Sequence, residues 1–466
     1  MTHTKNLIRF AAAISMTALS TVADYSLAAD TDASASATTA ASSQNGNRGD
    51  DKLPFLSAQA VRVQSAGELA RMQKYLDERI DRAAIHKSLI NAKGRKVDCV
   101  DINAQPALKN KLLQGHKVEL SPRSAPAQAP AAATHNMIEP LFEIEAATGA
   151  AAAAQTGACP AGSVPIPEVT SEDLHRFSSL DDFFAKYPAG AARRATPIIP
   201  PFHNGPTSQH QYAHAYRYVT NWGAQSTINV WATYTELNSE FSLGQIWVVA
   251  GSGGGLQTLE VGTQKYHDLY NDDNPHLFIY STRGGYAPGT GCYNNTCGDF
   301  VQVSSSIYPG AVLSPVSVFN GAQYEASMQW FKDMDGGAWW LNFQGQWVGY
   351  YPRALYNAGG VQDHAAEIDF GGEIIDNRNL NLHTSTDMGS GSFPSAWFQK
   401  AAYMKKLNYN YTTTTNPNTV WNTEATGLTT SRSDSACYDI AYYSGDANWG
   451  SYFFYGGPGY DYNNCR

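Results

Sequence analysis

Hydrophobic residues recur along this chain with two different periods. Between residues 60 and 92, large apolar side chains stand three or four positions apart, at Leu69, Met72, Tyr75, Leu76 and Ile80. This spacing is typical of one face of an amphipathic helix. A second, short helix is predicted over residues 171–186, because Ser171 and the two acids after it are favoured at helix starts.

The pattern changes after residue 201. Short segments rich in aromatic and β-branched residues are separated by Gly, Asn, Asp and Pro; five of them are residues 245–250, 276–281, 300–305, 338–343 and 347–351. Frequent turn residues between such strands indicate an antiparallel sheet structure rather than alternating strands and helices. We therefore predict a mainly β fold, in which an antiparallel β-sandwich domain follows a partly helical domain.

A segment with two arginines and four prolines, residues 187–201, separates these two halves. Alanine-rich stretches near residues 125–133 and 146–154 are expected to be flexible as well. In an exported protein, this organisation suggests a propeptide followed by a catalytic domain. Two permanent domains with an ordinary linker are the alternative.

The N-terminus has the three parts of a secretory signal. Lys5 and Arg9 precede an apolar stretch over residues 10–19, and small residues follow at 26–29. Residues 30–50 contain almost no large apolar side chains and cannot build a core. We expect a secreted protein, either extracellular or periplasmic. The alternative interpretation of the apolar N-terminal stretch is an ordinary buried helix. No later run of about 18 apolar residues predicts a membrane span.

Composition narrows the class of protein further. The formal net charge of −9 argues against nucleic-acid binding, which requires a basic surface. Six cysteines in an exported chain indicate disulfides. Nearness in the sequence suggests Cys99–Cys159, Cys292–Cys297 and Cys437–Cys465, although six cysteines allow other pairings. A zinc site is the alternative, but no Cys-x-x-Cys with accompanying His is present.

Several common catalytic motifs are absent from the sequence. There is no Gly-x-Ser-x-Gly, no His-Glu-x-x-His and no phosphate-binding glycine loop. His210 and His214 are four apart, a spacing that suits a metal on a helix, but the alternation around them indicates a strand. A serine nucleophile stays possible, because a triad is recognised by geometry rather than by order. We expect no metal and no cofactor.

Carboxylates are the stronger candidates for chemistry. Glu260 and Glu373 each stand beside glycine in a short apolar segment that reads as a strand. Strand parity would place Glu367, Asp369 and Glu373 on one face, provided that Gly371 and Gly372 form no bulge. Two glutamates converging on one cleft could act as general acid and general base in a hydrolysis. Each one could equally be a solvated or structurally bonded side chain.

Aromatic residues form the second candidate group. They could line a groove that stacks prolyl or sugar rings, or fill the sandwich core; they are Trp247, Trp330, Trp339, Trp340, Trp347, Tyr350 and Tyr351.

The chain resembles the neprosin family of secreted glutamic endopeptidases over nearly its whole length. Residues 98–107 and 159–166 are similar to the family's activation peptide. The motifs of the C-terminal half occur in the family's order: Gln245-Ile246-Trp247, Leu259-Glu260-Val261-Gly262, residues 266–272, residues 290–297, Gly349-Tyr350-Tyr351-Pro352, Phe370-Gly371-Gly372-Glu373, residues 383–391, residues 437–439 and residues 449–458.

The resemblance implies a β-sandwich peptidase that is made as a zymogen, uses two catalytic glutamates and cleaves after proline. Glu260 matches the first glutamate. For the second we favour Glu373, directly after the glycine pair, with Asp369 as its rival. In the family, the residue that follows Glu-x-Gly is often Trp. Here the residue after Glu260-Val261-Gly262 is Thr263.

Candidate substrate-binding residues are Gln245, Trp247 and Tyr350. The resemblance divides the chain into a signal peptide (1–29), a low-complexity segment (30–50), an activation peptide (51–195) and a peptidase domain (196–466). The expected partners are peptide or protein substrates that contain proline, and the chain's own propeptide. A carbohydrate-binding sandwich and a two-carboxylate glycosidase are the alternative functions.

Overall fold

The computed structural model describes residues 65–124, 136–143, 156–186, 210–378, 383–461 and 464–465. They all belong to one unit, Arg48–Arg466. The expected signal peptide, the segment 30–50, both alanine-rich stretches and the linker 187–201 lie outside the described residues.

The described elements are mainly strands. The α-helices are α1 (Ala66–Arg79), α2 (Ser171–His175), α3 (Leu180–Phe184) and α4 (His267–Tyr270). The strands of the N-terminal part are β1 (Ile85–Ile90), β2 (Lys96–Asp101), β3 (Leu141–Glu143), β4 (Thr156–Gly157) and β5 (Ser163–Pro167). The first strands of the C-terminal part are β6 (His210–Asn221), β7 (Gly223–Asn229), β8 (Phe241–Ala250), β9 (Gln257–Tyr266), β10 (His276–Thr282), β11 (Gly291–Tyr293), β12 (Val301–Gln302) and β13 (Glu325–Lys332). The remaining strands are β14 (Trp339–Phe343), β15 (Gln346–Tyr351), β16 (Ala365–Ile375), β17 (Ala402–Tyr411), β18 (Trp421–Glu424), β19 (Thr429–Arg432), β20 (Asp439–Asp446) and β21 (Gly450–Gly456).

The N-terminal part, residues 65–186, is the partly helical region that the sequence predicts. Helix α1 begins after Ser65, whose side chain accepts a hydrogen bond from the backbone N–H of Glu68. The expected second helix is two short helices, because Ser179 caps a new helix by accepting from the N–H of Asp182. A five-stranded antiparallel sheet in the order β4-β3-β1-β2-β5 completes this part.

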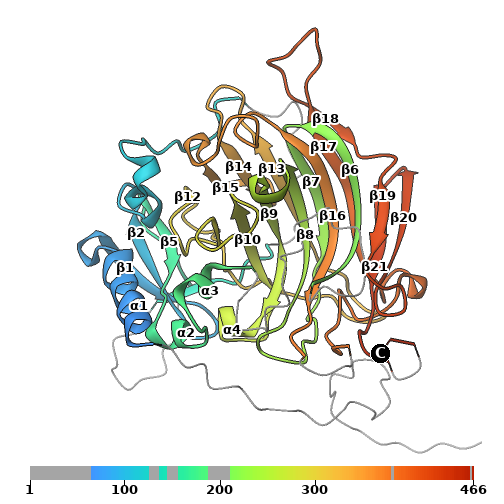
Figure 1. Ribbon diagram of the computed structural model, residues 1–466, viewed down its shortest axis with the longest axis horizontal. Coiled ribbons are helices and arrows are strands. Elements are labelled where there is room, and N and C mark those ends of the chain that lie inside the picture. Colours follow the sequence, from blue (N-terminus) through green and yellow to red (C-terminus); the bar gives the residue numbers. More distant parts are fainter. Residues whose placement is uncertain are drawn as a thin grey trace, which may run out of the picture. The chain divides into compact units, whose positions relative to one another are not determined.

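The C-terminal part contains two antiparallel sheets, as expected for a sandwich. One has seven strands in the order β11-β10-β9-β8-β16-β6-β19. The other has nine, in the order β12-β15-β14-β13-β7-β17-β21-β20, with β18 paired to β17. Figure 1 shows the long strands of both sheets running in two layers. The predicted strand 300–305 is much shorter, at Val301–Gln302.

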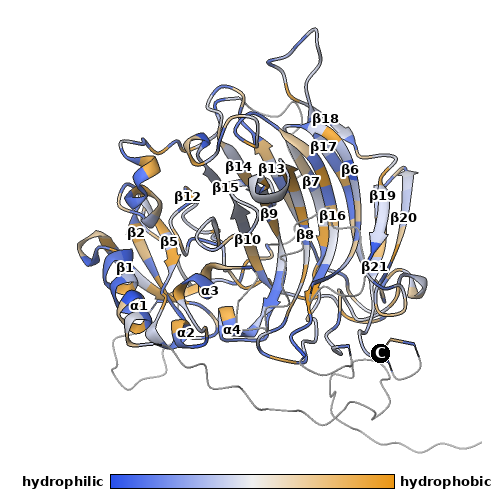
Figure 2. Cartoon of the chain, viewed as in Figure 1, coloured by the Kyte–Doolittle hydropathy of each residue, from blue (hydrophilic) through white to orange (hydrophobic). Residues whose placement is uncertain are grey.

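Alternation of side chains gives the seven-stranded sheet two unlike faces. In β16, Ile368, Phe370 and Ile374 are buried in the main apolar core, whereas the residues between them are polar or Gly. Hydrophobic and hydrophilic positions alternate along this strand and along β6 (Figure 2). The apolar face packs against the nine-stranded sheet, and the polar face is the one that carries the candidate carboxylates.

Most of the tryptophans singled out in the sequence fill the core. Trp330, Trp339 and Trp340 are fully buried in the nine-stranded sheet, where they contribute apolar area rather than a groove lining.

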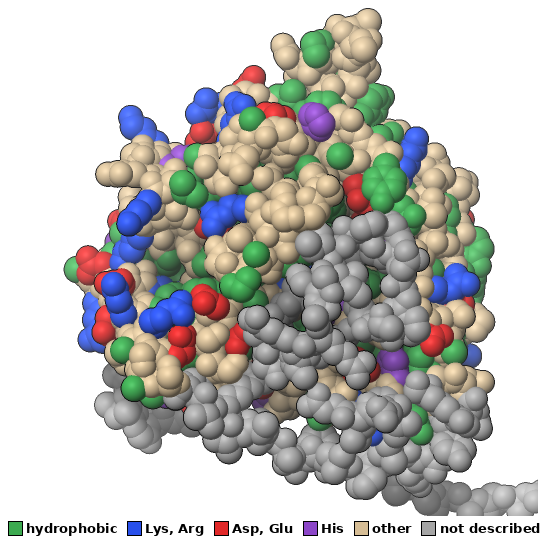
Figure 3. Space-filling model, viewed as in Figure 1, with side chains coloured by type: hydrophobic (Ala, Val, Ile, Leu, Met, Phe, Trp, Pro, Cys, Tyr) green, Lys and Arg blue, Asp and Glu red, His purple; other side chains and the backbone are tan. Residues whose placement is uncertain are grey.

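Three disulfides join the cysteine pairs suggested by nearness in the sequence: Cys99–Cys159, Cys292–Cys297 and Cys437–Cys465. No helix in the described part of the chain is long and apolar enough to cross a membrane. On the face drawn in Figure 3, positive and negative side chains are intermixed, without a basic patch.

Candidate active site

Strand register places Glu260 and Glu373 on the same face of the seven-stranded sheet. Their strands, β9 and β16, lie on either side of β8. Glu260 pairs with Trp247 and Glu373 with Leu243, and residues four apart on β8 point the same way. The register of β16 is unbroken across Gly371 and Gly372, so the glycine pair forms no bulge.

The glycine beside Glu373 serves the packing of the two sheets. A Cβ on Gly372 would lie 2.6 Å from Met388 Sδ and from Tyr455 Cε2. A larger residue would therefore force the layers apart beneath the candidate carboxylate.

A lysine from the N-terminal part lies between the two glutamates. Lys186 Nζ is 2.5 Å from Glu260 Oε2 and 2.7 Å from Glu373 Oε2. All three side chains are at most 1% exposed. Lys186 follows α3, at the end of the described N-terminal part. This contact brings the two carboxylates into one site and fills the space between them.

Each carboxylate also has neutral hydrogen-bond donors of its own. Glu260 Oε1 accepts from the hydroxyls of Thr258, at 2.9 Å, and Tyr286, at 2.7 Å. On the other side, Glu373 Oε2 accepts from Gln245 Nε2 at 2.8 Å, and Glu373 Oε1 lies 2.6 Å from His210 Nδ1.

These surroundings give the two glutamates different proton affinities. Burial raises the pKa of Glu260, and the ammonium of Lys186 offsets only part of that rise. Burial also acts to raise the pKa of Glu373, but Lys186 and His210 outweigh it and hold this pKa at about 2. Burial lowers the pKa of His210, which favours a neutral ring that donates its Nδ1 proton. The arrangement thus holds one carboxylate ionised beside one that takes up a proton more readily.

Asp369, the rival second acid, lies on the same face but has a different partner. Both of its carboxylate oxygens are within 2.9 Å of His214 Nδ1. The described contacts of Lys186 go to Glu260 and Glu373 instead. Glu373 is therefore the carboxylate that shares a site with Glu260.

Two of the three candidate substrate-binding residues are at this site. Gln245 bonds Glu373, and the ring of Trp247 lies 5.6 Å from Lys186 Nζ. Tyr350 does not join them. It lies in the nine-stranded sheet, and its hydroxyl bonds His116 Nε2 at 2.7 Å and the backbone N–H of Glu119 at 3.0 Å.

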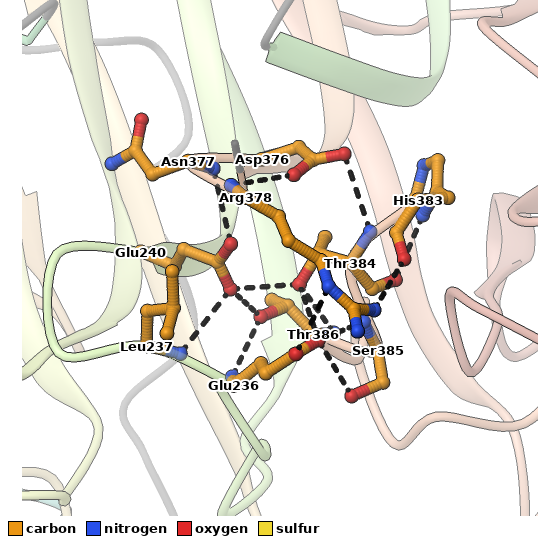
Figure 4. A network of polar contacts seen from close by, with 10 residues as sticks. All are labelled: Glu236, Leu237, Glu240, Asp376, Asn377, Arg378, His383, Thr384, Ser385 and Thr386. Carbon is orange, nitrogen blue, oxygen red and sulfur yellow. Dashed lines mark hydrogen bonds and ion pairs between the residues drawn. The ribbon is translucent and has the colours of Figure 1, made fainter. Parts of the chain in front are cut away.

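A second group of carboxylates, one buried and the others partly buried, lies near the ends of β8 and β16 (Figure 4). Glu240 is fully buried and accepts from the hydroxyls of Thr384, at 2.8 Å, and Thr386, and from Asn377 N–H. Neighbouring Glu236 accepts from Ser385 N–H at 2.7 Å. Burial raises the pKa of Glu240 to about 8.

Several residues of the main site could not be predicted from the sequence. Lys186, Thr258 and Tyr286 carry no motif that separates them from ordinary polar residues. The one available signal was the pair His210 and His214, whose spacing suits a strand face as well as a helix. The structure bonds each of these histidines to a carboxylate of β16.

Comparisons with known proteins place the chain in a family. The family model "Neprosin" matches residues 238–458, and the model "Neprosin activation peptide" matches residues 88–216. One similar solved structure is the crystal structure of Scytalido-glutamic peptidase with a peptide-based transition state analog. It is 10% identical, covers 54% of this chain and 98% of that chain, and has a TM-score of 0.28. Another is SCP-B, a member of the Eqolisin family of peptidases in complex with the tripeptide Ala-Ile-His, at 10% identity, 53% and 98% coverage and a TM-score of 0.26. The two family matches follow each other along one chain, which therefore belongs to the neprosin family and carries that family's activation peptide ahead of its neprosin domain.

Proposed function

We propose that this protein is a secreted, acid-acting glutamic endopeptidase that is made as a zymogen and cleaves peptide bonds after proline. The neprosin domain supports a peptidase activity. The observation that carries the proposal is the contact of one buried ammonium group, Lys186 Nζ, with both Glu260 and Glu373. It identifies a space between two carboxylates that a scissile peptide bond and a water molecule can take once Lys186 has left.

In the proposed reaction, water attacks the carbonyl carbon directly and no acyl-enzyme forms. Glu373 acts as the base that accepts a proton from the water, since His210 and Gln245 stay bonded to its carboxylate after Lys186 leaves. Glu260, whose pKa is raised by burial, donates a proton first to the carbonyl oxygen. On collapse of the tetrahedral intermediate the C–N bond breaks, Glu373 gives the proton it took from the water to the leaving amine, and a hydroxyl of the intermediate returns a proton to Glu260 as the new carboxyl group forms.

The acid dependence follows from the same pair. Two carboxylates in one buried site titrate together, and catalysis needs one of them protonated. Activity should be greatest in acid and decline towards neutrality as the second proton is lost.

In the zymogen, the N-terminal part blocks this site. Lys186 forms ion pairs with both glutamates and occupies the space between them, so neither water nor substrate can bind there. Contacts elsewhere hold the N-terminal part in place, including Arg95 to the carbonyl oxygen of Tyr270 at 2.8 Å and Arg176 to that of Asp268 at 2.7 Å. Cleavage between residues 187 and 209 would release it.

The preference for proline and the export of the protein are further parts of the proposal. Proline specificity comes from the family resemblance, and Trp247, beside Lys186, offers an aromatic surface on which a prolyl ring could stack. The disulfides suit an oxidising compartment outside the cytosol.

One experiment tests the whole proposal. The purified pro-form is incubated at pH 4, its new N-terminus is sequenced, and the product is offered a proline-containing peptide and a panel of polysaccharides. We expect a new N-terminus after residue 186 and peptide products ending in proline. An intact chain without peptidase activity, or cleavage of a polysaccharide instead, would reject it.

A further inference from the structure

Beyond the catalytic pair, the same face of the sheet carries two more acids. Glu367 and Asp369 precede Glu373 on β16, and the unbroken register from residue 367 to residue 373 puts all three on one face. Asp369 stands in the same row as Glu260, because both pair with Trp247. Glu367 is one step further along, opposite Val249 of β8 and Tyr218 of β6.

Among the described residues, Glu367 is a buried acid whose side chain has no hydrogen-bond or ion-pair partner. Its side chain belongs to a residue that is only 9% exposed, and its Oε1 atom is buried without any hydrogen bond. No lysine or arginine in the described part of the chain forms an ion pair with Glu367 or Asp369. A buried carboxyl group without a donor is costly, so a cation that entered here would relieve an existing penalty.

Two tyrosines stand next to this acid. Tyr216 pairs with Asp369, and Tyr218 with Glu367, so their rings share the face of the acids. The two rings meet edge to face at 5.6 Å, and Tyr218 is 61% exposed. Aromatic faces attract ammonium and guanidinium groups, and the exposed ring marks the side from which a side chain can enter.

We propose that Glu367, Asp369, Tyr216 and Tyr218 form a specificity subsite for a basic side chain, lysine or arginine, of the peptide substrate. The proposal rests on the peptidase function proposed above and names a substrate class for it. Lys186 shows that the same face can hold a buried cation against paired acids.

The position of the subsite limits which substrate residue can reach it. Glu367 stands six residues from Glu373, about 20 Å along β16, and one row beyond that of Glu260. Since an extended peptide advances about 3.3 Å per residue, we place the basic residue roughly three to five positions from the scissile bond.

The charged and titratable groups around Glu367 make its preference depend on pH. Asp369 lies on its own strand, Tyr216 and Tyr218 face it from β6, and its β8 neighbours Trp247 and Val249 carry no charge. Burial and the charge of Asp369 raise the pKa of Glu367 to about 8. A bound cation favours the ionised form, so selection for a basic residue should strengthen as the pH rises from 4 to 6.

The test uses the matured enzyme and matched peptides that contain one proline and carry Lys, Arg, Gln or Glu at positions two to five on either side of the cleaved bond. We expect one position at which Lys or Arg raises kcat/KM about tenfold over Gln at the highest pH that permits turnover. In Glu367→Gln this ratio should fall to near one, while cleavage of the Gln peptide persists. The control Asp335→Asn removes an exposed carboxylate from the turn between β13 and β14 and should leave the ratio unchanged.

Equal kcat/KM values for Lys and Gln peptides in the wild-type enzyme would overturn the subsite, whether or not any variant folds. A preference for Lys that survives in folded Glu367→Gln would do the same. Failure of the peptidase proposal looks different, because then no peptide in the set is cleaved.

Discussion

Two groups of glutamates, which are buried except for the partly buried Glu236, have different kinds of partner. Glu260 and Glu373 share one ammonium, that of Lys186, which comes from the N-terminal part. Glu240 instead accepts hydrogen bonds from the hydroxyls of Thr384 and Thr386. Glu236 accepts from the backbone N–H of Ser385 and forms an ion pair with Arg378, so the partners of this group lie within the C-terminal part itself (Figure 4).

This contrast separates a catalytic candidate from a structural one better than burial does. Glu240, Glu260 and Glu373 are all fully buried, and the pKa of each is shifted. The partners of Glu240 lie within the C-terminal part, so a cut in the linker would not remove them. The partner shared by Glu260 and Glu373 can leave, and its departure would open a site.

The largest expected effect is on catalysis. Glu260→Gln and Glu373→Gln should each lower kcat/KM for a proline-containing peptide by roughly 10²–10⁴-fold, because each removes a proton-transfer group. Glu240→Gln should stay close to wild type in the same assay. Similar losses in all three variants, with folding confirmed by thermal melting, would abolish the distinction between the two groups.

The next effect concerns the ammonium group that bridges Glu260 and Glu373. Lys186→Met in the full chain removes the partner of two buried carboxylates, and breaking a buried ion pair is strongly destabilising. We expect the pro-form to mature roughly tenfold faster at pH 5.5, measured by the appearance of the shorter chain on gels. Lys93→Met, at an exposed turn, is the matched control. An unchanged maturation rate would mean that Lys186 does not hold the closed form.

Acid should weaken this closure in a defined range. Although burial acts to raise it, Lys186 and His210 together hold the pKa of Glu373 at about 2, below its ordinary value of 4.5. A group with a depressed pKa stabilises the closed form above the ordinary value, and that contribution is lost as the pH falls towards 2. Hydrogen exchange of α3, corrected for intrinsic rates, should therefore increase between about pH 4.5 and 2. In Lys186→Met this pH dependence should weaken, because only His210 then lowers the pKa of Glu373.

The smallest expected effect is on thermal stability and concerns Glu240. The pKa of Glu240 is raised to about 8 from 4.5, so its contribution to stability is present below the ordinary value and lost as the pH rises through about 8. The melting temperature should fall by roughly 3–6 °C more between pH 5 and 8 in wild type than in Glu240→Gln. Parallel curves for the two proteins would contradict the raised pKa.

The sequence predicts the elements of this molecule better than it predicts the contacts of its site. The spacing of Met72, Tyr75 and Leu76 locates α1, and the alternation in β16 places Glu367, Asp369 and Glu373 on one face. Both are short-range patterns that follow from the periods of the backbone.

Contacts between distant segments could not be read in this way. Lys186 lies 74 residues before Glu260, in a stretch of ordinary composition, and only the docking of the N-terminal part brings them together. Tyr350 is the reverse case, since a motif made it a candidate and the fold places it in the other sheet. The choice of Glu373 over Asp369 also depended on contacts between distant segments. Glu373 is bonded to Lys186, whereas Asp369 is bonded to His214.

The pattern of disulfides has a consequence for reversibility. All six cysteines are paired, and no bridge crosses from residues 65–186 to residues 210–465. In the proposed zymogen, the N-terminal part is tethered and would act at a high effective concentration. After a single cut between residues 187 and 209 it becomes a separate molecule, held together by Cys99–Cys159, and its inhibition depends on dilution. Secretion into a large volume would therefore make activation effectively one-way, whereas a confined compartment would let the released piece bind again.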